Sequence, residues 1–122
     1  MYAYIKGRLT EKSPTHLVIE AAGVGFHINI SLTTYSKIGD DENIKIFTHL
    51  IVREDAQILF GFADEQEREL FRQLISVSGV GANTARLILS SLSGEELTDA
   101  IIMGNVSVLQ SVKGIGGKQH NA

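Results

Sequence analysis

The spacing of apolar residues changes its period near residue 63, and this change restricts the fold more than any other feature of the chain. Before it, apolar residues recur at every second position, as in Phe26–Ile30, which is typical of strands with one buried face. After it, as in Leu70–Ile75, they follow helical spacing. The sequence therefore predicts a β domain, residues 1–62, and a helical domain, residues 63–122. The boundary at Phe62–Asp64 contains no flexible linker, so we expect the domains to pack rigidly.

Clusters of turn-forming residues divide the first domain into short strands. The separators are Glu11–Pro14, Ala22–Gly25, Gly39–Asp41 and Glu54–Asp55. They leave room for about five strands, with one helical turn at Thr33–Ile38. Because so many short strands occupy so few residues, we expect a small closed barrel of the five-stranded type.

The second domain carries helix-start signals. Asp64 precedes Glu67 by three residues, and Ser93 precedes Glu96 in the same way, so both pairs fit a capping box. Asn105 is a further candidate cap, for a short helix that begins at the next residue. These signals predict an all-helical domain.

A short motif occurs twice in this helical domain. Val77–Asn83 and Val112–Lys118 share the frame Val-x-Gly-apolar-Gly, and each follows a helix-like stretch. At least the first copy also precedes one, at Thr84–Leu92. This layout is typical of a helix-hairpin-helix. Gly23–Gly25 has similar spacing but lies between two strands, so we interpret it as a hairpin turn only.

The chemistry of the repeated motif favours binding to DNA backbone. Glycine allows turn torsions that other residues adopt only at a cost, and it lets a DNA strand approach closely. The apolar residue between the glycines, Val80 or Ile115, would anchor the turn in the helical core. Amides of the turn and of the next helix then face outward at the positive end of a helix dipole. Such a site binds phosphate without reading sequence.

Composition argues in the opposite direction. The formal net charge is −3, whereas phosphate binding usually relies on Lys and Arg. Backbone amides add no formal charge, which reduces the conflict. The chain has no cysteine, so disulfides and thiolate metal sites are excluded. It also shows no signal peptide and no apolar run long enough to span a membrane, so we expect cytoplasmic residence.

Two other function classes remain open. An enzyme would need grouped catalytic residues, but the histidines are scattered and Asp40–Glu42 is typical of a solvated turn, so no catalysis, metal or cofactor is expected. The histidines are His16, His27, His49 and His120. A single-strand binder would stack bases on barrel aromatics, for which the candidates are Tyr2, Tyr4, Phe26 and Phe60, yet these fit a barrel core equally well.

From Met1 to about Lys118, the chain resembles the RuvA family, DNA-binding subunits of Holliday-junction branch-migration complexes. The resemblance is strongest at Phe47–Phe62, at Gln66–Phe71 and at the two glycine hairpins. It implies an OB-fold barrel followed by a small all-α domain with two helix-hairpin-helix motifs. It also implies a third domain that docks a motor, which we do not expect in a chain that ends at Ala122.

The resemblance implies a function and partners. Members bind four-way DNA junctions without sequence specificity and hold them open during recombination and repair. They assemble as homotetramers or octamers and work with a RuvB-type hexameric ATPase and a RuvC-type resolvase, so the ATPase activity resides in the partner. The alternative is a general DNA-binding module of a repair complex without junction preference.

The resemblance also implies roles for individual residues. Glu54 and Asp55 would form an acidic pin that keeps strands apart by repulsion. The phosphate contacts would be Gly79, Val80, Gly81, Asn83, Thr84, Gly114, Ile115, Gly116 and Lys118.

Two departures from the family pattern weaken the expected binding. The family usually has Pro-Lys after the first hairpin, whereas this chain has Ala82–Asn83. The second hairpin leads into Gln119–Ala122, so we expect it to lack its last helix, and we do not expect docking of the motor.

Overall fold

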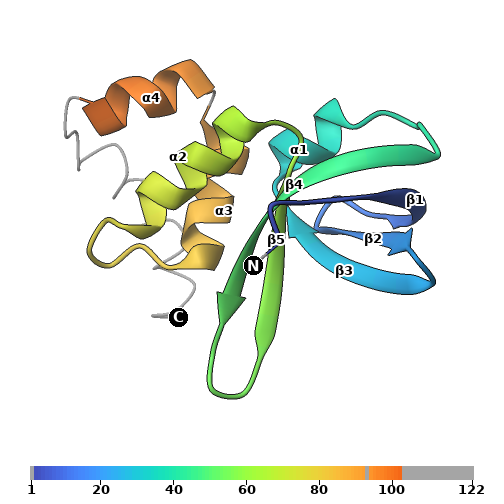
Figure 1. Ribbon diagram of the computed structural model, residues 1–122. Helices are drawn as coiled ribbons and strands as arrows, with labels where there is room; N and C mark the ends of the chain where they lie inside the picture. Colours follow the sequence, from blue (N-terminus) through green and yellow to red (C-terminus); the bar gives the residue numbers. More distant parts are fainter. Residues whose placement is uncertain (1, 93, 103–122) are drawn as a thin grey trace, which may run out of the picture. The chain divides into compact units, whose positions relative to one another are not determined.

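The computed structural model describes residues 2–92 and 94–102. Two compact units are present, Met1–Arg68 and Glu69–Ala122, and each is described by itself. In chain order the elements are β1 (Tyr4–Lys12), β2 (His16–Ala21), β3 (Val24–Ile30), α1 (Leu32–Lys37), β4 (Asn43–Val52), β5 (Gln57–Phe62), α2 (Glu65–Ile75), α3 (Ala82–Ser91) and α4 (Gly94–Ile102) (Figure 1).

The five strands of the first unit close into a barrel in the order β1-β2-β3-β5-β4, which confirms the predicted fold class. All neighbouring strands are antiparallel except β3 and β5. The period-2 apolar residues point inward, and their burial supplies the main driving force for closure. Six of them form the barrel core: Ile5, Leu17, Ile19, Ile28, Ile30 and Ile46.

The chain turns within residues 22–25 as expected, but the turn is shorter than the four residues that the sequence suggested. Ala21 pairs with Val24, so only Ala22 and Gly23 connect β2 to β3. Both have positive φ angles, 52° and 78°, as the type I′ turn of a two-residue hairpin requires. Gly25 already belongs to β3, which confirms that this glycine pair is a strand connection.

Helix α1 lies between β3 and β4, one residue earlier than the predicted helical turn. It begins at a side-chain cap, because the Ser31 hydroxyl oxygen accepts the Thr34 amide at 3.1 Å. Both residues are fully buried, although serine and threonine usually remain exposed. Their hydroxyls therefore need partners inside the protein.

Helix α2 begins at the predicted cap, but only half of the capping box forms. Asp64 Oδ1 accepts the Glu67 amide at 2.8 Å, and Asp64 Oδ2 accepts Lys37 Nζ at 3.0 Å. Partial burial acts to raise the pKa of Asp64, yet the amide hydrogen bond and Lys37 together leave it lowered. The Glu67 side chain turns away from the helix start and is 4% exposed.

Burial of the Glu67 carboxylate is compensated by hydrogen bonds that it accepts from two hydroxyl groups at the start of α1. Its Oε2 accepts Ser31 Oγ at 2.5 Å, and its Oε1 accepts Thr34 Oγ1 at 2.5 Å. Thr34 Oγ1 in turn accepts the Ala63 amide at 3.2 Å. These bonds satisfy the buried oxygens and fix the first turn of α2 against α1.

In the second unit, the described residues are helical apart from the turns, as the sequence predicts. The helices bury one apolar face each, through Leu70, Phe71, Leu74, Ala85, Ile88, Leu89, Leu97 and Ala100. The expected caps Ser93 and Asn105 lie outside the described residues. Within residues 2–92 and 94–102, no helix is long and apolar enough to cross a membrane.

Candidate nucleic-acid interface

The first glycine hairpin, Val77–Gly81, connects α2 to α3. Two main-chain hydrogen bonds shape it: Val77 N donates to Leu74 O, and Val80 N donates to Val77 O, both at 3.0 Å. Gly79 has a φ of 82°, in the left-handed region that glycine adopts without strain. Val80 is 8% exposed and so fills the anchoring role predicted for it.

The second glycine of the hairpin serves a different purpose from the first. Gly81 has a φ of −87°, which any residue adopts, so the expectation that both glycines meet a torsional need is wrong for this one. A Cβ built on Gly81 would meet no atom within 4 Å. Gly81 is the N-cap of α3 and, having no side chain, leaves the helix start uncapped.

The start of α3 consequently presents free amide groups. The first main-chain bond runs from Ala85 N to Gly81 O at 2.9 Å. The amides of Ala82, Asn83 and Thr84 have no acceptor in the part of the chain that the structure describes. Amides at the positive end of a helix dipole form an anion site, and Gly79, Gly81 and Asn83 are all exposed beside it.

The first four residues of α3, Ala82–Ala85, include no cation. Asn83 stands where the family resemblance led us to expect lysine, and the nearest cation along α3 is Arg86, one turn further. Partial burial lowers the pKa of Arg86, although an arginine remains charged at neutral pH. The sequence motif did not single out Arg86, because it lies beyond the hairpin.

Glu54 and Asp55 form the tip of the β4–β5 hairpin. Val52 pairs with Gln57, and Arg53 and Ala56 exchange both main-chain hydrogen bonds, at 2.7 and 3.4 Å. Both acidic residues are exposed, and the hairpin that carries them projects from the barrel (Figure 1). Two adjacent carboxylates are thus placed at the end of a two-stranded arm.

The second hairpin lies outside the described residues. This applies to Gly114, Ile115, Gly116 and Lys118. Their assignment as phosphate contacts therefore remains a prediction from the sequence.

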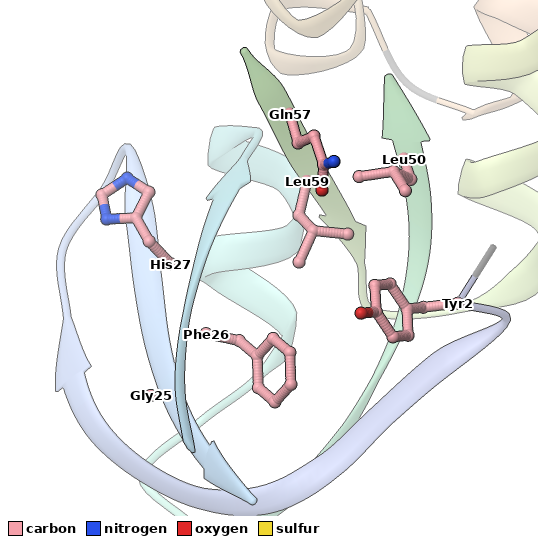
Figure 2. Close-up of a pocket in the computed structure, with 7 residues that line it drawn as sticks. All are labelled: Tyr2, Gly25, Phe26, His27, Leu50, Gln57 and Leu59. Carbon is pink, nitrogen blue, oxygen red and sulfur yellow. The ribbon is translucent and has the colours of Figure 1, made fainter. Parts of the chain in front are cut away.

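The barrel aromatics divide into three groups. Phe60 is 3% exposed and belongs to the interior, whereas Tyr4 is 51% exposed. Tyr2 and Phe26 pack edge to face with ring centroids 5.9 Å apart. They line a pocket of about 270 Å³ together with Gly25, His27, Leu50, Gln57 and Leu59, and Figure 2 labels these residues.

The histidines and the acidic loop form no metal centre in the described residues. His16 bonds to Glu11 and Ser13 and stacks on His27 with ring centroids 4.6 Å apart. Residues 40–42 are exposed, and within residues 2–92 and 94–102 no group of three His, Cys, Asp or Glu residues could hold an ion. His120 lies outside the described residues.

Two family models match the chain. The RuvA N terminal domain matches residues 1–61, half of the 122 residues, and the SAM-like helix-hairpin-helix tandem matches residues 71–120. The first match covers four of the barrel strands and most of β5, and the second includes the hairpin described above. Each match agrees with the architecture of the residues that the structure describes within it.

Several relatives that share one protein name align with nearly the whole chain. The sequence is 56% identical to a protein of Christiangramia forsetii, 52% to one of Flavobacterium psychrophilum and 53% to one of Bacteroides thetaiotaomicron. Each is called Holliday junction branch migration complex subunit RuvA, and each alignment covers 97% of this chain. The chain spans 59–61% of the length of these relatives. With the matching barrel, the helical region and these identities, the chain belongs to the RuvA family.

Proposed function

We propose that this chain binds four-way DNA junctions through phosphate contacts at the first glycine hairpin and contributes to branch migration in recombination and repair. The observation that carries the proposal is the start of α3, where the amides of Ala82, Asn83 and Thr84 lack acceptors among the described residues. A phosphate oxygen supplies acceptors for such amides and is attracted by the helix dipole.

The proposal gives each hairpin residue a role that this geometry supports. Gly79 supplies the turn, Val80 anchors it, and exposed Gly81 leaves space for the DNA backbone. Asn83 and Thr84 contribute amides. The second hairpin, Gly114–Gly116 with Lys118, would bind a further phosphate by sequence analogy with the first.

The proposal also includes an assembly. Because its relatives are named as subunits of a branch migration complex, we propose that the chain acts with copies of itself, as a tetramer. The energy for branch migration would come from a RuvB-type ATPase, which docks on the third domain that the family resemblance implies and not on residues 1–118. The chain itself would then be a DNA-binding subunit without catalysis.

A gel-shift competition tests the proposal. A labelled four-way junction is bound to the chain at moderate salt and challenged with linear duplex of the same arm sequence. We expect the junction to resist competition by a large excess of duplex. If duplex competes equally well, the chain is a general DNA-binding module without junction preference.

Glu54 and Asp55 have a role in this proposal that can be tested separately. Carboxylates cannot contact phosphate favourably, so an acidic pin would act by repelling strands near the crossover. Replacing both residues by their amides, Glu54→Gln with Asp55→Asn, is expected to raise junction affinity about threefold to tenfold, since it removes two unfavourable charges.

The pin experiment has an internal control. Affinity for linear duplex should change less than twofold, because duplex has no crossover for the pin to enter. Thermal stability should also remain unchanged, since both side chains are exposed in a turn. Equal gains for junction and duplex would show that the two residues only contribute to the overall charge.

A further inference from the structure

The outer face of the β1–β4 ladder combines cations with aromatic rings. Strand register places Tyr4 opposite Phe47 and Lys6 opposite Lys45, while Ile5 and Ile46 between them point into the core. Tyr4, Lys6 and Lys45 are exposed. We define the β1–β4 patch as the outward residues Tyr4, Lys6, Lys45 and Phe47 together with Arg68.

The lysine pair is unfavourable without a counter-ion. Residues directly opposite on antiparallel strands have Cβ atoms about 4.5–5.5 Å apart, and like charges there destabilise a sheet. Neither lysine forms an ion pair in the described part of the chain. The fold thus holds two positive charges together on an exposed surface, in a chain whose net charge is −3.

The rings of the patch hold the cations in place. Lys45 Nζ lies 4.3 Å from the Tyr4 ring centroid and 5.2 Å from that of Phe47, both within cation–π range. The Arg68 guanidinium carbon lies 5.5 Å from the Phe47 ring, and its Nη1 donates to Ala3 O at 2.6 Å. Lys45 and Arg68 are therefore oriented without being neutralised by carboxylates.

The Arg8 end of the β1–β4 ladder has carboxylates beside it. Arg8, one outward row beyond Lys6, pairs with Glu20 at 2.8 Å. This hydrogen bond, with the charges of Glu20 and Glu42, raises the pKa of Arg8. The charge of Arg8 is thus paired with a carboxylate. Lys6, Lys45 and Arg68, by contrast, form no ion pair among the described residues.

We propose that the β1–β4 patch is a second DNA site that binds single-stranded DNA. Cations beside exposed rings match the repeat of a single strand, in which phosphates alternate with bases that can stack. An acidic protein surface would use the cations but has no need of the exposed Tyr4 ring. Oligonucleotides usually bind OB folds on the strand 2–3 face, so this patch is a separate surface.

The inference does not depend on the junction proposal, because different residues carry it. Its test uses the whole chain and a fluorescently labelled oligothymidylate, with affinity measured by anisotropy over a range of salt concentrations. The double variant Lys6→Gln/Lys45→Gln should weaken binding about tenfold and reduce the salt slope by about 1.4, which is about 0.7 for each lost phosphate contact. Duplex affinity should fall less.

Two control variants separate the patch from other effects. Lys12→Gln/Lys37→Gln makes the same change in net charge elsewhere on the barrel, where both lysines already pair with aspartates, and should keep affinity within twofold. Gly81→Asp changes the first hairpin and should retain binding of the single strand. If Gly81→Asp loses junction binding but retains single-strand binding, the junction defect is caused by the hairpin alone.

A charge reversal provides a second readout. Lys6→Glu places opposite charges across the ladder, so we expect its melting temperature to rise by about 2–4 °C while single-strand binding is lost. Unchanged single-strand affinity in Lys6→Gln/Lys45→Gln would overturn the proposal, and so would an equal loss in the control pair. A change in the sedimentation of Lys6→Gln/Lys45→Gln without DNA would also overturn the proposal, since the patch would then be a contact between copies of the chain.

Discussion

Gly81→Asp is expected to lower junction affinity about 100-fold or more, which corresponds to about 2.7 kcal/mol, while the protein stays folded. The new carboxylate would lie at the start of α3 and accept hydrogen bonds from the amides that we propose bind phosphate. It would also repel the DNA backbone. Binding is measured by gel shift with the four-way junction.

The same substitution should leave stability unchanged or slightly higher. Gly81 has an ordinary φ of −87° and open space around its Cβ, so the side chain fits without strain. Aspartate is also a better N-cap than glycine, by a few tenths of a kcal/mol. Gly81→Ala is the matched control, because it adds the Cβ but no acceptor, and we expect less than a fivefold loss of affinity. Retained junction binding by Gly81→Asp would exclude the first hairpin as the phosphate site.

Glu67→Ala is expected to produce the largest loss of stability, about 3 kcal/mol. The substitution leaves the buried hydroxyls of Ser31 and Thr34 without acceptors, and each lost bond to a charged group costs about 1.5–3 kcal/mol before relaxation. Chemical denaturation followed by circular dichroism measures the change. Glu67→Gln should cost less, because its one amide oxygen can still accept one of the hydroxyls.

An exposed glutamate on the same helix turn controls for helix effects. Glu65→Ala removes an equal charge from the first turn of α2, where the side chain is exposed, and should change stability by less than about 0.5 kcal/mol. Equal losses for Glu65→Ala and Glu67→Ala would show that the buried hydrogen bonds contribute nothing beyond the helix dipole.

Local patterns in the sequence were sufficient to predict the barrel and the hairpin. The period-2 spacing at Ile28 and Ile30 reports one buried face, and burial of that face closes the sheet. The helix start at Asp64 and the anchoring role of Val80 also depend on residues near them in sequence. Such features can be predicted because the interacting groups are only a few positions apart.

Features that depend on distant residues could not be predicted. Glu67 fits a capping box, and nothing near it in sequence indicates its bonds to Ser31 and Thr34, more than thirty positions away. The pairing of Lys6 with Lys45 depends on strand register, which spacing alone leaves undetermined. The two hairpin glycines look identical in sequence, but only Gly79 has a positive φ.

The proposed function depends above all on contact between phosphate and the main-chain amides of the first hairpin. An NMR titration of the ¹⁵N-labelled chain with a short DNA duplex tests it most directly, because each amide is observed individually. We expect the largest shifts at the amides of Gly79, Gly81, Ala82, Asn83 and Thr84. Saturable binding with unchanged amide signals at these positions would contradict it.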